Sequence, residues 1–204
     1  MRVKRAKRPI ALSPASRARA YLSKRSWGLR PRLYAVARFA GFRGLRVKII
    51  MRNHWQVVGQ SVRGAVHERN GLPNQDAIYW LPASGEGSLI VLAVADGHGS
   101  ARYSRSHIGA CLAVESAAQL VHEFINSQAD NLSLIKDATE DWLPRALVRK
   151  WVEVVTDHLN ADPLNEESIV AYGATLIVAA VTEQFAVYLQ LGDGEILTVA
   201  RAGK

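Results

Sequence analysis

The sequence predicts a layered α+β sandwich in which helices pack on antiparallel sheets. Two observations support this fold class. Short apolar runs rich in β-branched residues and bounded by glycine, such as residues 89–95, indicate buried strands. Longer segments with apolar residues at helical spacing lie between a first group of predicted strands and a last group. The order of strands, then helices, then strands again favours helices packed on antiparallel sheets.

Four strands are predicted in the first part of this region. Residues 55–58 and 62–66 are short apolar runs, and residues 77–81 lead into the glycine-containing turn at 84–87. Residues 89–95 are apolar without interruption, which is typical of a strand buried on both faces.

Two helices are predicted next, at residues 104–125 and about 146–159, because apolar side chains recur there along one face. The chain then returns to strands, which are predicted at 172–182, 186–191 and 196–200.

Charge divides the chain near residue 53. Residues 1–53 carry 16 Lys and Arg and no Asp or Glu, whereas residues 54–204 carry 10 Lys and Arg and 18 Asp and Glu. We therefore expect a basic N-terminal extension at 1–53 and one modest globular domain at 54–204. The domain is net acidic, so no specific nucleic-acid partner is expected.

Three interpretations of the basic extension stay open. A block of like charges is typical of a disordered arm that contacts anionic partners. An Arg-rich, Ser-containing segment without acids is also typical of an organelle transit peptide. Met51 precedes the domain by a few residues, so the extension is alternatively a non-native product of an over-extended reading frame. In each case we expect residues 1–50 to add nothing to the fold of the domain.

Asp96 lies between the apolar run 89–95 and a glycine-rich turn, so it is held rigidly where a strand meets solvent. Gly97 has no Cβ, and its carbonyl can therefore approach an ion closely. His98 follows at the same rim, with an imidazole that can give or take a proton near neutrality. Asp76 follows Asn74 and Gln75 at the start of another predicted strand. Two such carboxylates brought close together would repel each other unless a hard divalent cation lay between them.

These segments resemble the metal-dependent type 2C protein serine/threonine phosphatases, in particular bacterial members. The resemblance covers about residues 55–202 and depends on the order, spacing and chemistry of five segments. They are GQSVRG at 59–64, GLPNQDA at 71–77, VADGHGS at 94–100, YGATLIV at 172–178 and LGDGE at 191–195. The resemblance implies an α-β-β-α arrangement of two central sheets flanked by helices, with a metal site at one edge between the sheets.

The resemblance also implies roles for individual residues. Asp96 would bridge two Mg²⁺ or Mn²⁺ ions, with Asp76 and the carbonyl of Gly97 as further ligands. His98 would act as the general acid that protonates the departing alkoxide. Asp193 would be associated with a weaker third ion, although an aspartate between two glycines is equally typical of a hairpin turn. The substrate would be a protein phosphorylated on Ser or Thr.

Two further expectations follow from the resemblance. Related phosphatases often carry an arginine that grips the substrate phosphate, and Arg69 or Arg63 could serve, although neither has the usual spacing to Asp76. The family also has two later metal-binding aspartates, and none occurs in the 11 residues after Asp193. We therefore expect the chain to be the N-terminal portion of the phosphatase domain, with a fold incomplete at its C-terminus.

Three function classes remain open at this point. The first is the metal-dependent phosphatase, and the second is a catalytically inactive relative that acts as a regulatory binding module. The third is a nucleic-acid or membrane-surface binder driven by the basic extension. The single cysteine, Cys111, lies in a predicted apolar helical face and is expected in the core, which agrees with a cytoplasmic location. No run of about 18 uninterrupted apolar residues predicts a membrane span.

Overall fold

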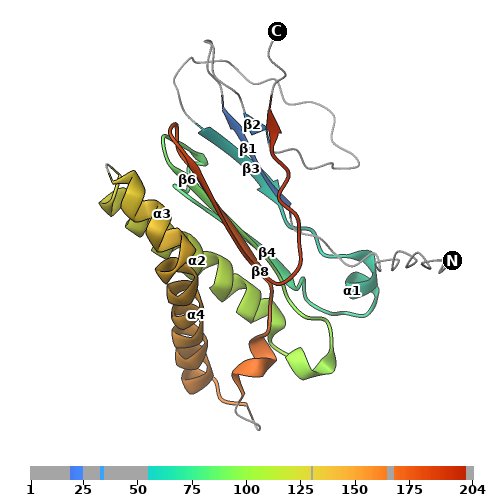
Figure 1. Ribbon diagram of the computed structural model, residues 1–204. Helices are drawn as coiled ribbons and strands as arrows, with labels where there is room; N and C mark the ends of the chain where they lie inside the picture. Colours follow the sequence, from blue (N-terminus) through green and yellow to red (C-terminus); the bar gives the residue numbers. More distant parts are fainter. Residues whose placement is uncertain (1–18, 25–32, 35–54, 130, 165–167, 201–204) are drawn as a thin grey trace, which may run out of the picture.

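The computed structural model describes residues 19–24, 33–34, 55–129, 131–164 and 168–200. It has a mixed α+β fold with two antiparallel sheets, and three longer helices pack on one side (Figure 1). The dense charge run at the N-terminus and Met51 lie outside the described residues.

The four-stranded sheet carries most of the core. Its order is β4 (Asp76–Leu81), β6 (Ile90–Asp96), β7 (Leu176–Val181) and β8 (Ala186–Leu191), and every pair is antiparallel. Strand β6 lies inside the sheet and is buried along most of its length, as its continuous apolar sequence predicts. The chain therefore places the β6 terminus, where Asp96 lies, between the ends of β4 and β7.

The second sheet is five-stranded, and its order is β5 (Glu86–Gly87), β3 (Trp55–Gln60), β1 (Arg19–Lys24), β2 (Leu33–Tyr34) and β9 (Val199–Ala200). Strands β1 and β2 come from the basic segment, whose charge and composition predict no part in the fold of the domain. Strand β1 pairs with all six residues of β3. The boundary near residue 53 stays a prediction, but these two strands belong to the same sheet as β3.

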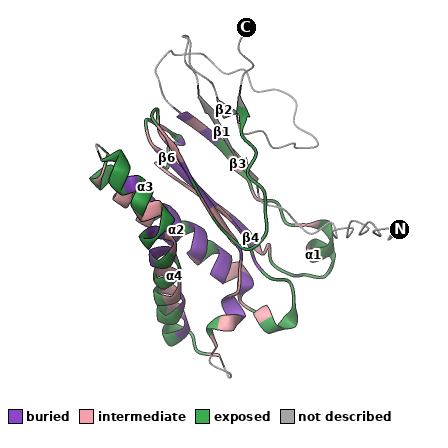
Figure 2. Cartoon of the chain, viewed as in Figure 1, coloured by how far each residue is buried: buried purple, intermediate pink, exposed green. Residues whose placement is uncertain are grey.

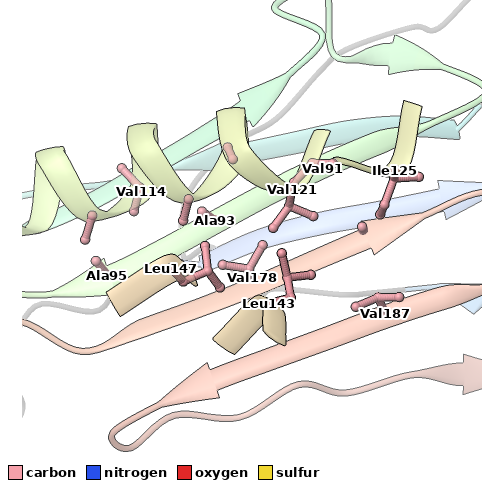
Figure 3. Close-up of a cluster of buried hydrophobic side chains, with 14 of the residues drawn as sticks. Val91, Ala93, Ala95, Val114, Val121, Ile125, Leu143, Leu147, Val178 and Val187 are labelled. Carbon is pink, nitrogen blue, oxygen red and sulfur yellow. The ribbon is translucent and has the colours of Figure 1, made fainter. Parts of the chain in front are cut away.

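Helices α2 (Ser106–Ser127) and α4 (Trp142–Ala161) cover one face of the four-stranded sheet, and α3 (Leu132–Glu140) packs beside them. Small and β-branched side chains make this interface. Figure 3 shows Val114 and Val121 of α2 in one cluster with Val91 of β6 and Val178 of β7. Burial of such apolar surface contributes about 25 cal/mol per Å². This cluster therefore fixes the position of the sheet relative to the helices.

The opposite face of the four-stranded sheet is covered by β3. The side chains of Trp55 and Val57 are buried against Ile90, Leu92 and Val181. The two sheets thus contact each other through an apolar cluster, while the helices occupy the other face. Figure 2 shows the consequence for burial, since β6 is mostly buried, α2 is buried along the face that meets the sheet, and α1 is mostly exposed.

Among the described residues, one helix, α2, has the length and apolarity of a membrane span, and half of its most apolar window is buried. In this structure α2 is the central helix of the core, where Ala110, Ala113 and Val121 contact the sheet.

Several element predictions need correction. The strand predicted at 62–66 is wrong, because residues 61–64 have no regular structure and α1 (Ala65–Arg69) follows. Helix α3 was not predicted, because its nine residues are fewer than the window of about 11 over which helical periodicity is assessed. The strand predicted from residue 172 begins only at Leu176, since a 3₁₀ turn, η2 (Ile169–Tyr172), comes first. The last strand contains two residues rather than five.

Candidate metal centre

Asp76 and Asp96 face each other across two neighbouring strands. Strand β4 begins at Asp76, strand β6 ends at Asp96, and the two residues are direct partners in the antiparallel register. Directly opposed residues in such a pair project their side chains to the same face of the sheet. Asp76 is 5% exposed, whereas Asp96 is exposed. One carboxyl therefore lies in the protein and the other at its surface.

The start of β4 is fixed by a small hydrogen-bond network. The Ser61 hydroxyl donates to the carbonyl of Asp76 at 3.0 Å, and the Asn74 amide donates to the Ser61 Oγ at 2.7 Å. The Asp76 backbone N–H donates to Oδ1 of Asn74 at 3.3 Å. The polar residues before Asp76 therefore hold its backbone in place rather than merely forming a turn.

The end of β6 is fixed by residues far away in the sequence. The Asp96 N–H donates to Oγ1 of Thr175 at 3.1 Å, and the Thr175 N–H donates to the Asp96 carbonyl at 2.8 Å. The Gly97 N–H donates to the carbonyl of Gln75 at 3.0 Å. A Cβ on Gly97 would lie 2.7 Å from that carbonyl and 2.9 Å from the backbone of Ser106. Glycine is required here because three backbone segments meet without room for a side chain.

The electrostatic surroundings of Asp96 show which charges converge there. Burial raises the pKa of Asp96 above its ordinary 3.8, and the negative charge of Asp193 raises it further. A hydrogen bond with the Asp76 carboxyl and the nearby imidazoles of His98 and His67 lower the same pKa. Two carboxyls this close repel each other when both are charged, unless a proton or a cation offsets the repulsion.

Asp193 lies in the exposed turn that follows β8. Gly192 and Gly194 both have positive φ, +85° and +141°, and their carbonyls accept hydrogen bonds from the Gln190 side chain. This geometry agrees with the interpretation of Asp193 as a residue of a tight turn. Its charge nevertheless acts on Asp96. The turn therefore brings a third carboxylate within electrostatic reach of the pair.

His98 is exposed beside the pair. Its backbone N–H donates to the Gly173 carbonyl at 3.0 Å, and its ring packs against Tyr103 with 4.7 Å between centroids. A Cβ on Gly173 would approach Cδ2 of His98 to 2.9 Å. The imidazole is thus supported on one side and reachable from solvent on the other.

The two arginines proposed for phosphate binding lie on the α1 loop. Arg63 donates to the carbonyl of Leu72 at 3.4 Å and lies 4.0 Å from the Glu68 carboxylate. Arg69 is exposed at the end of α1. The residue of this loop whose charge acts on Asp96 is instead His67, whose Nδ1 is buried without a hydrogen-bond partner among the described residues. Sequence reasoning missed His67 because no spacing rule connects it to the aspartates.

The available donors suit a hard cation. Two carboxylates and the carbonyl of Gly97 are oxygen ligands, and Mg²⁺ is commonly held by one or two carboxylates while it keeps several waters. Within the described ranges, no group of three or more His, Cys, Asp and Glu side chains is arranged to hold a metal ion by itself. A divalent cation between Asp76 and Asp96 would offset the repulsion between their negative charges. The residues therefore fit a magnesium or manganese site that water and other oxygen donors complete.

Comparison with family models identifies the class of protein. The model for protein phosphatase 2C matches residues 63–204, which is more than half of the chain. The matched region contains Asp76, Asp96, His98 and Asp193, and it leaves out β1, β2 and β3. The chain belongs to the protein phosphatase 2C family. Comparisons with curated proteins and with solved structures give no match.

Proposed function

We propose that this chain is a metal-dependent phosphatase of proteins phosphorylated on serine or threonine. The observation that carries the proposal is the direct register between Asp76 and Asp96, which lies inside the region matched by the family model. Members of the family are generally metal-dependent, and paired carboxylates on adjacent strands are suited to bind Mg²⁺ or Mn²⁺.

Each residue at the centre has a proposed task. Asp76, Asp96 and the Gly97 carbonyl would hold two ions, and Asp193 would bind a third ion more weakly. Bound Mg²⁺ or Mn²⁺ supplies an activated water and neutralises charge on the phosphoryl oxygens. The exposed side of Asp96 leaves this chemistry accessible to a phosphorylated protein segment.

His98 is proposed to protonate the leaving oxygen. Serine and threonine alkoxides are poor leaving groups, so a positioned acid lowers the barrier to their departure. The backbone of His98 is fixed by Gly173, while its ring remains exposed. This combination suits a side chain that must meet a substrate from solvent.

The complete layering of the fold is also a proposal. The described residues give helices on one face of the four-stranded sheet and β3 on the other. A second helical layer outside the five-stranded sheet would complete the α-β-β-α sandwich that the sequence predicts.

A regulatory binding module without catalysis is the alternative function. It is favoured by the absence, within the described residues, of three clustered metal-binding side chains. Phosphate release from a phosphothreonine peptide distinguishes the two. The phosphatase predicts release with Mn²⁺ that EDTA abolishes. Equal release in excess EDTA would contradict the metal mechanism, and no release with Mn²⁺ would favour the regulatory module.

A further inference from the structure

A partly buried hydrogen-bond network surrounds the hydroxyl of Tyr172, whose own side chain is fully buried. Arg105 donates to this hydroxyl at 2.7 Å, and Nδ1 of His158 lies 2.9 Å from it. Arg105 also forms a 2.9 Å ion pair with Asp162. The network therefore joins the residue before α2, the last turns of α4 and the end of η2.

The donors and acceptors of this network match one another. Arginine can only donate, so the Tyr172 oxygen accepts from Arg105 and its own proton is free for Nδ1 of His158. With its own proton on Nε2, the imidazole of His158 can accept this hydrogen bond at Nδ1. The ring centroids of His158 and Tyr172 lie 5.6 Å apart in an edge-to-face arrangement. A fully matched polar network inside a protein holds its members in one geometry.

Tyr172 is directly followed by the residues that hold the Asp96 turn. The Gly173 carbonyl accepts from the His98 N–H, Ala174 forms an isolated bridge with Gly97, and Thr175 exchanges two hydrogen bonds with Asp96. Residues 172–175 are thus one continuous support behind the candidate centre.

Residues 172–175 also pack against α2. An ideal Cβ on Gly109 would lie 1.8 Å from the Tyr172 carbonyl oxygen, so the backbone of Tyr172 touches the helix. The Arg105 N–H donates to the carbonyl of Ala171 at 2.9 Å. Backbone contacts therefore fix one side of Tyr172 and the hydroxyl network fixes its side chain.

We propose that Arg105, Tyr172 and His158 are positioning residues, which hold the Gly173 carbonyl and thereby the backbone of His98. Loss of the hydroxyl network would allow residues 172–175 to move, and His98 would move with them. The positioning itself depends on the contacts above, while its catalytic consequence rests on the proposed function.

Amide hydrogen exchange tests the positioning without reference to activity. Tyr172→Phe keeps the ring and removes only the hydroxyl, and Tyr188→Phe, at an exposed site on β8, is the matched control. We expect exchange at the His98 and Thr175 amides to accelerate about 5- to 10-fold in Tyr172→Phe, the size expected for one lost hydrogen bond. Exchange in the core of α2 should stay unchanged. Unaltered exchange at His98, or equal acceleration throughout the domain, would overturn the proposal.

His158→Phe is a second variant that keeps an aromatic ring beside Tyr172 and removes the acceptor. We expect the same acceleration of hydrogen exchange at the His98 amide in this variant. The proposal therefore stays testable if the tyrosine variant does not fold.

The catalytic consequence is tested with two substrates that differ in their leaving group. p-Nitrophenolate leaves without assistance, whereas a threonine alkoxide needs a proton from the acid. With Mn²⁺ present, Tyr172→Phe should lower kcat about tenfold for a phosphothreonine peptide and less than about threefold for p-nitrophenyl phosphate. Equal losses on both substrates would show a general structural effect and contradict the positioning of the acid. If the wild-type protein hydrolyses neither substrate, the proposed function fails, and hydrogen exchange alone decides the positioning.

Discussion

Asp76 and Asp96 are register partners at the ends of β4 and β6, although 20 positions separate them in the sequence. The pairing places one buried and one exposed carboxyl on the same face of the sheet. Asp193 adds a third negative charge from the turn after β8. This concentration of like charge at a strand end has a cost for the fold unless a proton or a cation offsets it.

The first prediction concerns activity. Asp96→Asn should lower kcat by at least ~10²-fold while the protein stays folded, because the amide lacks the charge that holds the ions and metal-activated water contributes several kcal/mol. Steady-state kinetics with a phosphothreonine peptide and Mn²⁺ measures the effect, with circular dichroism as the check on folding. Activity within about threefold of wild type would show that Asp96 is only a turn residue.

The second prediction concerns stability without metal. The folded state raises the pKa of Asp96 above 3.8, so it binds this proton more tightly than the unfolded chain does. Stability contributed by this group is therefore lost as the pH rises from 3.8 through the raised pKa, and the full penalty is present at neutral pH. In EDTA at neutral pH, Asp96→Asn should raise the thermal midpoint, and the gain should shrink when the pH falls to about 4. A lower midpoint for the variant at both pH values would contradict this electrostatic account.

The third prediction concerns the close contact between Gly109 of α2 and the backbone of Tyr172. Gly109→Ala places a Cβ against a backbone oxygen that cannot move away easily. The gain in helix propensity is about 1 kcal/mol. Overpacking typically costs about 1–3 kcal/mol, and a 1.8 Å approach to a backbone oxygen places this site at or above the upper end of that range. We expect the thermal midpoint to fall by roughly 5–10 °C. Gly99→Ala is the control, since its nearest neighbour is the Gln75 side chain at 3.7 Å. Equal midpoints for the two variants would be inconsistent with the close contact.

Periodicity predicted the parts of the fold that are buried on a regular pattern. Strand β6 and helix α2 were predicted within two residues at each end, because both have long apolar patterns. Helix α3 was missed because its nine residues give only a short periodic pattern, and η2 because a 3₁₀ turn has no apolar period of its own. The pairing of β1 with β3 depends on long-range contacts that local patterns do not report.

The site was predictable where a motif carried the chemistry. The glycine-rich turn after Asp96 and the polar residues before Asp76 predicted two carboxyls at strand ends, and the structure places them opposite each other. The metal-binding, acid and phosphate-binding roles of the candidate residues all stay predictions. The proximity of His67 to Asp96 and the network around Tyr172 could not be predicted, since each joins elements whose contact is set by tertiary packing.

The fourth prediction concerns the basic segment. Strand β1 pairs with the full length of β3, so removal of residues 1–53 exposes an edge of β3, whose Trp55 and Val57 are buried against the four-stranded sheet. We expect the shortened chain to lose roughly 5 °C or more in thermal midpoint at physiological salt. An unchanged midpoint would instead support the expectation from charge and composition, that this segment adds nothing to the domain.

Binding of Mn²⁺, followed by the electron paramagnetic resonance signal of the free ion, tests the central claim most directly. If Asp76 and Asp96 form the metal centre, the wild-type protein removes Mn²⁺ from solution and Asp96→Asn binds it at least ~10-fold more weakly. Asp157→Asn, an exposed aspartate on α4, should bind as the wild type does. Equal Mn²⁺ affinity in the wild type and Asp96→Asn would contradict the assignment of this pair as the metal centre.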